Sequence, residues 1–227
     1  MRAAIVLFPG SNREGDVARA LQRASGKAPT IVWHDESALP DRTDLVVLPG
    51  GFSYGDYLRC GAIAARARIM GAVRAHAARG GLTLGVCNGF QILCEAGLLP
   101  GVLMRNAQRR FIGKLHHIRV ENAATRFTRG YAAGQTIKSV LAHGEGNYVA
   151  GSGDLAQLES AGRVAFRYCD SAGQTAGANP NGSMNNIAGI YNAGFNVLGL
   201  MPHLENLIDP LVGGEDGRAL FDALAAA

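Results

Sequence analysis

A cysteine lies between two glycines where an apolar run meets a helical pattern, in the segment G-V-C-N-G-F-Q at residues 85–91. Few residues avoid steric strain in so tight a strand-to-helix turn. The turn would present the sulfur of Cys87 at the carboxyl end of the strand. The N–H groups of the following helix would favour its thiolate form and could hold an oxyanion. A buried cysteine more often only fills space, but this setting favours a nucleophile.

Short apolar runs alternate with helical patterns through the first half of the chain. Strands are expected at residues 3–8, 30–34, 45–48 and 82–86, with helices at 14–24 and 63–78. This alternation predicts an α/β fold with a mostly parallel central sheet and helices on both faces. Ligands bind outside the carboxyl ends of the strands in such sheets.

The second half of the chain is expected to add further strands with little helix between them. These strands are predicted at residues 115–120, 139–142, 163–168, 188–191 and 197–201, before a last helix at 217–226. Residues 170–186 are rich in Gly, Asn, Pro and Ser, which is typical of a long loop or hairpin tip. With no evident linker or repeat, residues 1–227 are expected to form a single domain.

The composition narrows the class of protein. Hydrophobic residues make up 48% of the chain and charged residues 18%, which indicates a globular protein with a real core. No apolar run is long enough to span a bilayer, and the N-terminus lacks a complete signal peptide, so we expect a cytoplasmic protein without a membrane partner. The cysteines show no metal-ligand or disulfide spacing, so no metal is expected.

The net charge of +4 is modest. The densest basic cluster comprises Arg105, Arg109 and Arg110, and it is too small to indicate a nucleic-acid surface. It is either a solvated loop or a site for an acidic group. Residues 10–16 have the glycine spacing of a phosphate loop, but Asp16 stands where that loop needs lysine. A turn that begins a helix is the better interpretation.

Gly50 and Gly51 follow the strand predicted at 45–48. Paired glycines at a strand end let backbone N–H groups point outward, as an oxyanion hole requires. A plain tight turn explains the same pair equally well. The neighbouring cysteine turn favours the functional interpretation.

A nucleophilic cysteine needs a base, and His203 is the best candidate. It follows the strand at 197–201, and Glu205 lies two residues further on, on the same face of an extended segment. The carboxylate could hold the imidazole while the other ring nitrogen meets the thiol. His34 lacks a well-placed acid, and His76 is expected at the surface of a helix. The sequence thus predicts a Cys87–His203–Glu205 triad.

Two other polar positions lie near the predicted site. Gln91 is four residues after Cys87 on the same helix face, where its amide could bind a substrate or cap a turn. His143 follows the strand at 139–142, and the glycines after it would expose backbone groups at the same edge of the sheet.

Four motifs occur in a fixed order: P-G-G-F-S-Y-G-D at 49–56, G-V-C-N-G-F-Q at 85–91, H-G-E-G at 143–146 and M-P-H-x-E at 201–205. Together they resemble the class I glutamine amidotransferases of the triad type. The chain most resembles the glutaminase subunits of phosphoribosylformylglycinamidine synthase. That narrower resemblance rests on F-P-G-S-N at 8–12, the run at 51–61 and N-P-N-G-S at 179–183, and it spans essentially the whole chain.

The resemblance implies a flavodoxin-like amidotransferase fold and the hydrolysis of L-glutamine through a Cys87 thioester. It also implies an oxyanion hole from the N–H groups of Gly51 and Asn88, and glutamine-binding roles for Phe52, Gln91 and His143. Ammonia would pass to a large synthetase subunit, which binds ATP and Mg²⁺, in a complex with a small accessory subunit. No cofactor is expected on this chain.

The chain departs from the family at one position, because Leu204 replaces the second proline of M-P-H-P-E. Proline would stiffen the segment between His203 and Glu205, so leucine could loosen the pair. The spacing is kept, and activity is expected to survive. The alternatives are a related cysteine hydrolase, an amidotransferase serving another synthetase, and a non-catalytic regulatory subunit on the same fold.

Overall fold

The structure is a computed structural model that describes residues 1–226. Its strands are β1 (Ala3–Leu7), β2 (Thr30–Trp33), β3 (Leu45–Leu48), β4 (Leu82–Val86), β5 (Val102–Met104), β6 (Ile112–Val120), β7 (Thr136–His143), β8 (Asn147–Val149), β9 (Val164–Cys169), β10 (Ile187–Tyr191) and β11 (Val197–Leu200). Its α-helices are α1 (Glu14–Ser25), α2 (Met70–Ala78), α3 (Asn88–Glu95), α4 (Ser152–Ser160) and α5 (Arg218–Ala225).

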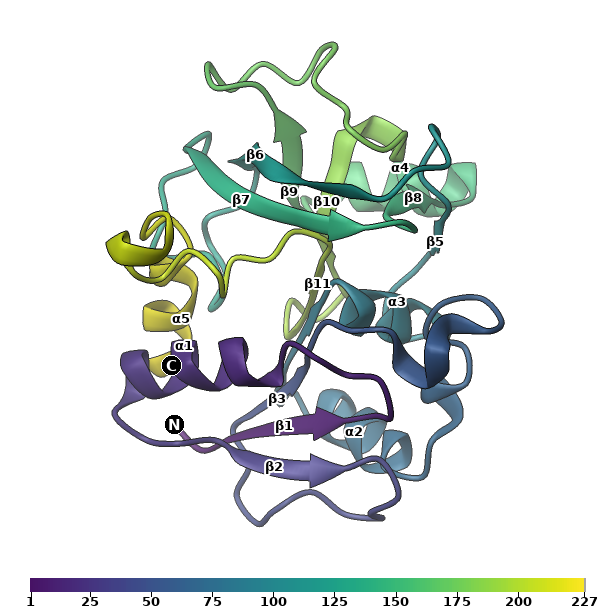
Figure 1. Ribbon diagram of the computed structural model, residues 1–227, viewed down its shortest axis with the longest axis vertical. Helices are drawn as coiled ribbons and strands as arrows, with labels where there is room; N and C mark the ends of the chain where they lie inside the picture. The colour runs from purple at the N-terminus through teal and green to yellow at the C-terminus, as the bar shows by residue number, and fades with distance from the viewer. Residues whose placement is uncertain (227) are drawn as a thin grey trace.

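Within the described residues, nine strands form one sheet in the order β2-β1-β3-β4-β11-β10-β9-β6-β7, and β5 pairs with β8 apart from it. The block from β2 to β11 is parallel and has the strand order of flavodoxin-like folds. The strands from β10 to β7 are antiparallel. The predicted α/β fold, with added antiparallel strands in the second half, is confirmed (Figure 1).

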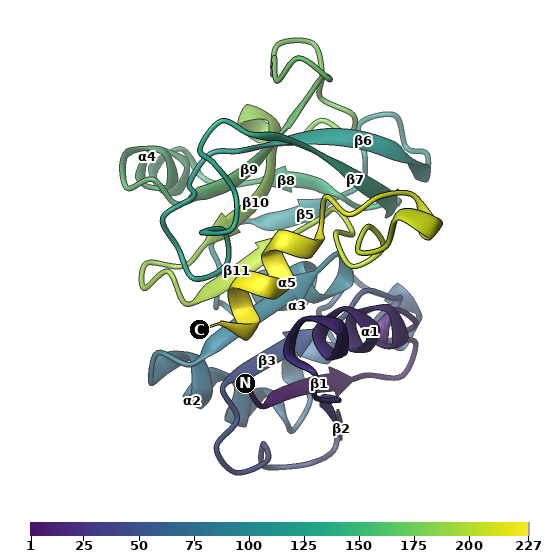
Figure 2. The ribbon, with the colours of Figure 1, turned by 90° about the vertical axis from the view of Figure 1, so that its left-hand side faces the viewer.

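Helices cover both faces of the parallel block. Helices α1 and α5 pack against each other on one side, and α2 and α3 lie on the other (Figures 1 and 2). Strands β3 and β4, enclosed by these layers, consist entirely of buried residues. Burial on both faces explains their continuous apolar sequence. Among residues 1–226, no helix combines the length and apolar character needed to span a membrane.

Some predicted elements differ from the structure. The helix predicted over residues 63–78 is broken: a short 3-10 helix (Ala64–Arg66) ends at Ala67, whose backbone is extended, before α2 begins. At the break, Ile69 is fully buried and its N–H donates to the carbonyl of His34, directly after β2, so these tertiary interactions override helix propensity. Strands β5 and β8 and helix α4 were not predicted.

Candidate active site

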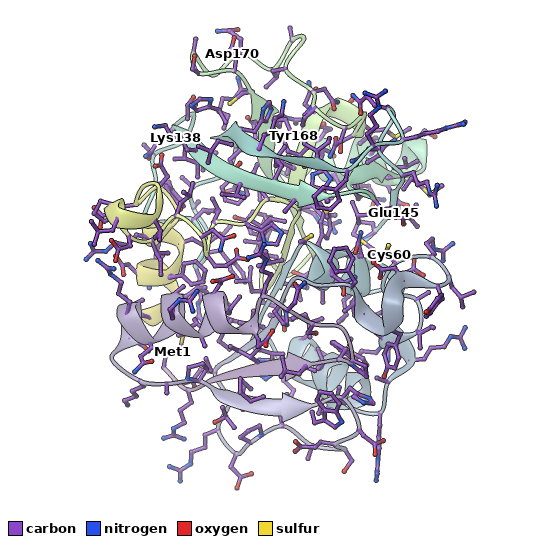
Figure 3. The ribbon with its side chains drawn as sticks, viewed as in Figure 1. Met1, Cys60, Lys138, Glu145, Tyr168 and Asp170 are labelled. Atoms are coloured by element: carbon purple, nitrogen blue, oxygen red, sulfur yellow. The ribbon has the colours of Figure 1, made fainter. Side chains whose placement is uncertain are left out.

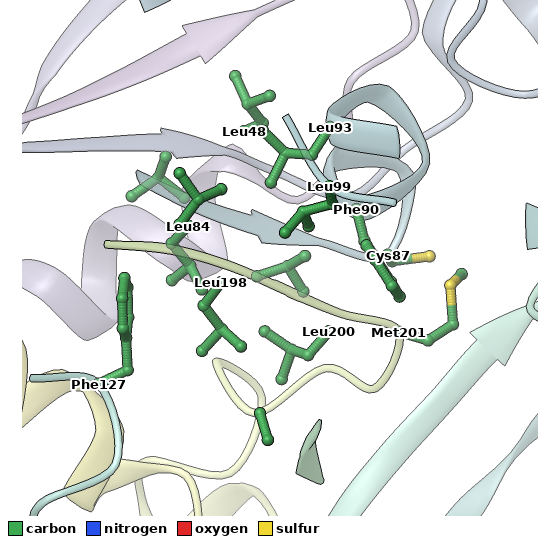
Figure 4. Close-up of a cluster of buried hydrophobic side chains, with 14 of the residues drawn as sticks. Leu48, Leu84, Cys87, Phe90, Leu93, Leu99, Phe127, Leu198, Leu200 and Met201 are labelled. Carbon is green, nitrogen blue, oxygen red and sulfur yellow. The ribbon is translucent and has the colours of Figure 1, made fainter. Parts of the chain in front are cut away.

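Cys87 occupies a strained turn between β4 and α3. Its backbone angles are φ 51° and ψ −107°, a left-handed conformation that a side chain disfavours. Its N–H donates to the carbonyl of Leu200, which fixes the turn against β11. In Figure 4 the side chain lies at the end of a buried apolar cluster that includes Leu84 and Leu200, with its sulfur directed away from them.

The glycines on either side of Cys87 are required by close packing. A Cβ atom on Gly89 would lie 1.9 Å from the carbonyl oxygen of Leu48, and one on Gly85 would lie 2.6 Å from that of Gly89. Both distances are far below van der Waals contact. Helix α3 can therefore pack this closely against β3 and β4 only because residues 85 and 89 are glycines. The sequence pattern around Cys87 is therefore a requirement of the turn itself.

His203 and Glu205 follow β11 and form a buried pair. The Nδ1 atom of His203 lies 2.6 Å from Oε1 of Glu205, and both side chains are at most 2% exposed. Burial lowers the pKa of His203, but the Glu205 carboxylate and the Cys87 sulfur outweigh it and raise the pKa to about 10. The imidazole is therefore held as an imidazolium between a carboxylate and the sulfur.

Leu204 does not loosen this pair. Its side chain is buried in the apolar core, and the N–H of His203 donates to the carbonyl of Val140 in β7. The segment is thus fixed by packing and by a backbone hydrogen bond, without a proline at position 204.

The predicted oxyanion groups lie beside this pair. Gly51 has φ 152°, and a Cβ atom there would be 2.6 Å from the carbonyl oxygen of Gly10. A Cβ atom on the preceding Gly50 would be 2.7 Å from Cε1 of His203, so the glycine turn packs directly against the imidazole. Asn88 is the first residue of α3, and its N–H therefore has no acceptor within the helix.

A cavity of about 180 Å³ opens beside the Cys87 sulfur. It gathers residues from both halves of the sheet and from the loop after β3: Gly51, Phe52, Asp56, Cys60, Cys87, Gln91, Phe111, Ala142, His143, Gly144 and Glu145. The predicted residues Gly51, Phe52, Gln91 and His143 are thus brought together around the cysteine. Asn88 is buried and follows Cys87 directly at the start of α3, and His203 packs against Gly50.

His143 presents a nitrogen with no partner. Its Nδ1 atom lies 3.2 Å from Oδ1 of Asn106, while its buried Nε2 atom has no hydrogen-bond partner among the described residues. Burial and the charge of His203 lower the pKa of His143 to about 4, so the ring is neutral at pH 7. Because Oδ1 of Asn106 also accepts from the N–H of Gly146, Nδ1 is the protonated nitrogen and Nε2 is an acceptor.

The side chain of Gln91 is held by the protein. Its amide nitrogen donates to the carbonyl of Glu145 at 2.7 Å, and its oxygen accepts from the Asn88 side chain at 2.8 Å. The Asn88 oxygen in turn accepts from the N–H of Ser53. These bonds tie α3 to the loops after β3 and β7, so Gln91 shapes the cavity wall.

The structure corrects the prediction for His76 and places His34 elsewhere. His76 is 4% exposed and its Nε2 atom bonds the carbonyl of Leu82, so it is buried and not at the surface as predicted. His34 pairs with the hydroxyl of Tyr54 at 2.8 Å. Neither ring belongs to the cavity. Within residues 1–226, no group of three or more potential ligands is arranged to hold a metal ion.

Sequence reasoning missed four side chains of the site: Asp56, Cys60, Asn106 and Glu145. Asp56 and Cys60 lie within the run at 51–61, and Glu145 lies within H-G-E-G, so the motifs contained them without indicating their roles. Asn106 is buried and supports His143, although it lies in no motif.

Comparison with known proteins identifies the family. Residues 1–213 match the CobB/CobQ-like glutamine amidotransferase domain. The chain belongs to this family of glutamine amidotransferases. The resemblance stated from the sequence motifs is confirmed.

Relatives of this glutamine amidotransferase match it along nearly its whole length. The phosphoribosylformylglycinamidine synthase subunit PurQ of Bradyrhizobium diazoefficiens is 62% identical over 99% of this chain and 97% of its own. The protein of the same name from Brucella suis is 56% identical over 97% of this chain and 96% of its own.

Solved structures give the same result. The structure of PurLQS from Thermotoga maritima contains a chain with a TM-score of 0.87 and 42% identity, covering 99% of this amidotransferase and 97% of that chain. Another glutamine amidotransferase from Thermotoga maritima has a TM-score of 0.59 at 15% identity, covering 100% of this chain and 99% of its own. This more distant likeness shows the shared fold alone.

Proposed function

We propose that this chain is the glutaminase subunit of a phosphoribosylformylglycinamidine synthase. It hydrolyses L-glutamine and passes the ammonia to a synthetase subunit that forms the amidine of formylglycinamide ribonucleotide in purine biosynthesis. The observation that carries the proposal is the strained Cys87 beside the buried His203–Glu205 pair, at a cavity lined by the glycine turn. The full-length similarity to proteins of that name supports the choice of pathway.

The reaction follows from the positions of the groups. The Cys87 sulfur attacks the side-chain amide carbon of glutamine, and the N–H groups of Gly51 and Asn88 stabilise the resulting oxyanion. The His203 imidazolium gives its proton to the leaving nitrogen, the carbon–nitrogen bond breaks, and a γ-glutamyl thioester and ammonia remain. His203 then takes a proton from water, which attacks the thioester and releases glutamate. Glu205 holds the imidazole in position through both steps.

The partners follow from the same proposal. A large synthetase subunit would bind ATP, Mg²⁺ and the ribonucleotide, and a small accessory subunit would complete the complex.

The phosphate-loop pattern at residues 10–16 has a structural role in this chain. The N–H groups of Asn12 and Arg13 both donate to the carbonyl of Gly50, so this loop supports the glycine turn.

A labelling experiment tests the nucleophile. The glutamine-like diazo-ketone 6-diazo-5-oxo-L-norleucine is expected to modify Cys87 of the full chain, as located by peptide mass spectrometry. Cys87→Ala should lower glutamine-dependent amidine formation by the assembled complex at least a thousandfold, with ammonia-dependent formation retained. Cys94→Ala, on the same helix but turned toward Pro100, is the matched control and should remain active. Full glutamine-dependent activity in Cys87→Ala would refute the assignment.

A further inference from the structure

The segment N-P-N-G-S at residues 179–183 contributes to the family resemblance, but none of its residues lines the Cys87 cavity. Its Asn181 is completely buried, and the side-chain amide donates to the carbonyl of Gly146 at 2.8 Å. The same amide donates to the hydroxyl of Tyr168 in β9 at 3.2 Å. Figure 3 shows Tyr168 in the antiparallel half of the molecule. The segment therefore bonds the loop after β7 from outside the cavity.

Gly146 is held at both of its backbone polar groups. Its N–H donates to Oδ1 of Asn106 at 3.0 Å, and its carbonyl accepts from Asn181. The hydroxyl of Ser183 lies 3.1 Å from the same carbonyl. Buried backbone groups are costly to leave unpaired, so each of these bonds restricts where the glycine can lie. Two asparagines from different segments thus fix a single residue of the loop.

The segments that carry the two asparagines are also bonded to each other. The N–H of Ala107, which follows Asn106, donates to the carbonyl of Asn181 at 2.9 Å. Gly182 has φ 93°, and a Cβ atom there would lie 2.8 Å from the Cβ atom of Ala107. The segments therefore pack too closely for a side chain at residue 182. Together they form one support for the loop after β7.

The position of Gly146 in turn fixes part of the cavity wall. A Cβ atom on Gly146 would lie 2.4 Å from Cε1 of His143, so the glycine packs directly against the imidazole. The carbonyl of the preceding residue, Glu145, accepts from the Gln91 amide at 2.7 Å. His143, Glu145 and Gln91 all line the Cys87 cavity. A displacement of Gly146 would therefore move the part of the wall that the loop after β7 contributes.

We propose that Asn181 is a positioning residue: by fixing the carbonyl of Gly146, it holds the loop after β7 where a bound substrate needs it. This inference rests on the proposed function, in which the cavity binds glutamine. A loop that is already ordered does not have to be ordered at the expense of substrate binding. His203 is fixed separately, by Glu205 and by β7. Loss of Asn181 should therefore weaken substrate binding more than it slows the chemical steps.

Removal of the Asn181 amide tests the proposal. In the assembled complex, Asn181→Ala should raise the KM for glutamine about tenfold, with kcat and ammonia-dependent activity within about twofold of the wild type. On the free chain, labelling of Cys87 by 6-diazo-5-oxo-L-norleucine should slow about tenfold, while labelling by iodoacetamide stays within about twofold. The NMR signal of the Cε1–H group of His143, assigned by its absence in His143→Gln, should shift because Gly146 packs against that atom.

Two further variants distinguish positioning from a general loss of stability. Ser183→Ala removes only a hydroxyl from the same cluster and should give the same changes to a smaller extent, so it decides the question if Asn181→Ala does not fold. Asn196→Ala is the matched control, because Asn196 also donates to two backbone carbonyls but lies before β11, at the end of that strand opposite His203. It should lower the urea midpoint and leave KM, labelling and the His143 signal unchanged.

The results for the inference and for the proposed function can be told apart. Unchanged KM, labelling and His143 signal in folded Asn181→Ala or Ser183→Ala would overturn the inference. A higher KM without a shift of the His143 signal would overturn it too, because the effect would not pass through Gly146. Equal changes in Asn196→Ala would also overturn it. If the wild-type chain reacts with iodoacetamide but not with the diazo-ketone, the proposed function itself fails, and the inference fails with it.

Discussion

At residue 87 the chain adopts a conformation that costs free energy. A left-handed cysteine is unfavourable by roughly 1–3 kcal/mol, and the cost persists because the bond to Leu200 and the packing of α3 fix the turn. The turn directs the sulfur out of the apolar cluster and toward the cavity, as the proposed role of Cys87 as the nucleophile requires. The backbone strain at Cys87 therefore supports its proposed role as the nucleophile. The amino-acid composition alone does not indicate this role.

Replacing the cysteine by glycine should relieve this strain. Cys87→Gly is expected to be more stable than Cys87→Ala by about 1 kcal/mol, because only alanine keeps the Cβ atom that the backbone angles disfavour. Urea unfolding of both variants measures the difference. At Cys94, inside α3, the order should reverse, with glycine about 1 kcal/mol less stable than alanine. The same order at both positions would contradict the argument.

The His203–Glu205 pair makes stability depend on pH. The folded pKa of about 10 lies above the unfolded value of about 6.5. The contribution of His203 is therefore complete below pH 6.5 and is lost as the pH rises toward 10. In Glu205→Gln the carboxylate is gone while burial remains, so the pKa of His203 should be far lower. The loss of stability between pH 6.5 and pH 10 should then be smaller.

NMR titration of the histidine rings checks this prediction, with urea midpoints measured across the same pH range. The ring of His76, which bonds Leu82 elsewhere in the fold, should titrate identically in both proteins. We also expect Glu205→Gln to lower kcat by about 10²–10⁴, as removal of an orienting carboxylate does. A midpoint near 10 in the variant would show that the carboxylate does not raise the pKa.

At the scale of elements, regular strands and the cysteine turn were predictable because their causes are local. Continuous apolar runs mark β3 and β4, and a glycine pair marks the turn at Cys87. The break before α2 was not predictable, because it depends on the burial of Ile69 and on its hydrogen bond to His34, which is far away in the sequence. Short elements such as β5 and β8 are formed by pairing with each other and have too few residues for a periodic signal.

The residues of the candidate active site also divide into those placed by local sequence and those that only the fold brings together. The contact between His203 and Glu205 was predictable because the two residues share a face of one extended segment. Asp56 and Glu145 were not, since they are far apart in the sequence and only the fold brings them to one cavity. Their partner Cys60 has no sequence signal of its own, because its contact with Glu145 joins two distant parts of the chain.

The packing of α3 on β3 can be tested with alanine at two glycines. Gly89→Ala should destabilise the protein by about 3 kcal/mol, because its Cβ would overlap the carbonyl of Leu48. Activity should fall as well, since α3 carries Cys87 at its start. Gly71→Ala in α2 is the matched control: no atom lies within 4 Å of the new Cβ, so stability should rise by about 0.5–1 kcal/mol. Equal effects on the urea midpoint would refute the packing explanation.

At the scale of the whole molecule, the site joins two differently built halves of one sheet. Cys87 comes from the parallel block, while His143 is the last residue of the antiparallel β7 and Glu145 follows that strand. The contact between the halves is direct, because the N–H of His203 bonds β7 at Val140. The cavity therefore exists only when both halves are assembled, although the cysteine turn itself needs only the parallel block.

This arrangement predicts how the site is lost in denaturant. Labelling of Cys87 by 6-diazo-5-oxo-L-norleucine should disappear in the same urea transition as the far-UV circular dichroism of the sheet, since recognition needs both halves. Iodoacetamide, which needs only an accessible sulfur, should instead react faster through that transition as burial of Cys87 is lost. If diazo-ketone labelling persisted after the antiparallel strands had unfolded, the parallel block alone would form the site. Loss of labelling well before the sheet unfolds would instead show that the antiparallel half detaches as a separate unit.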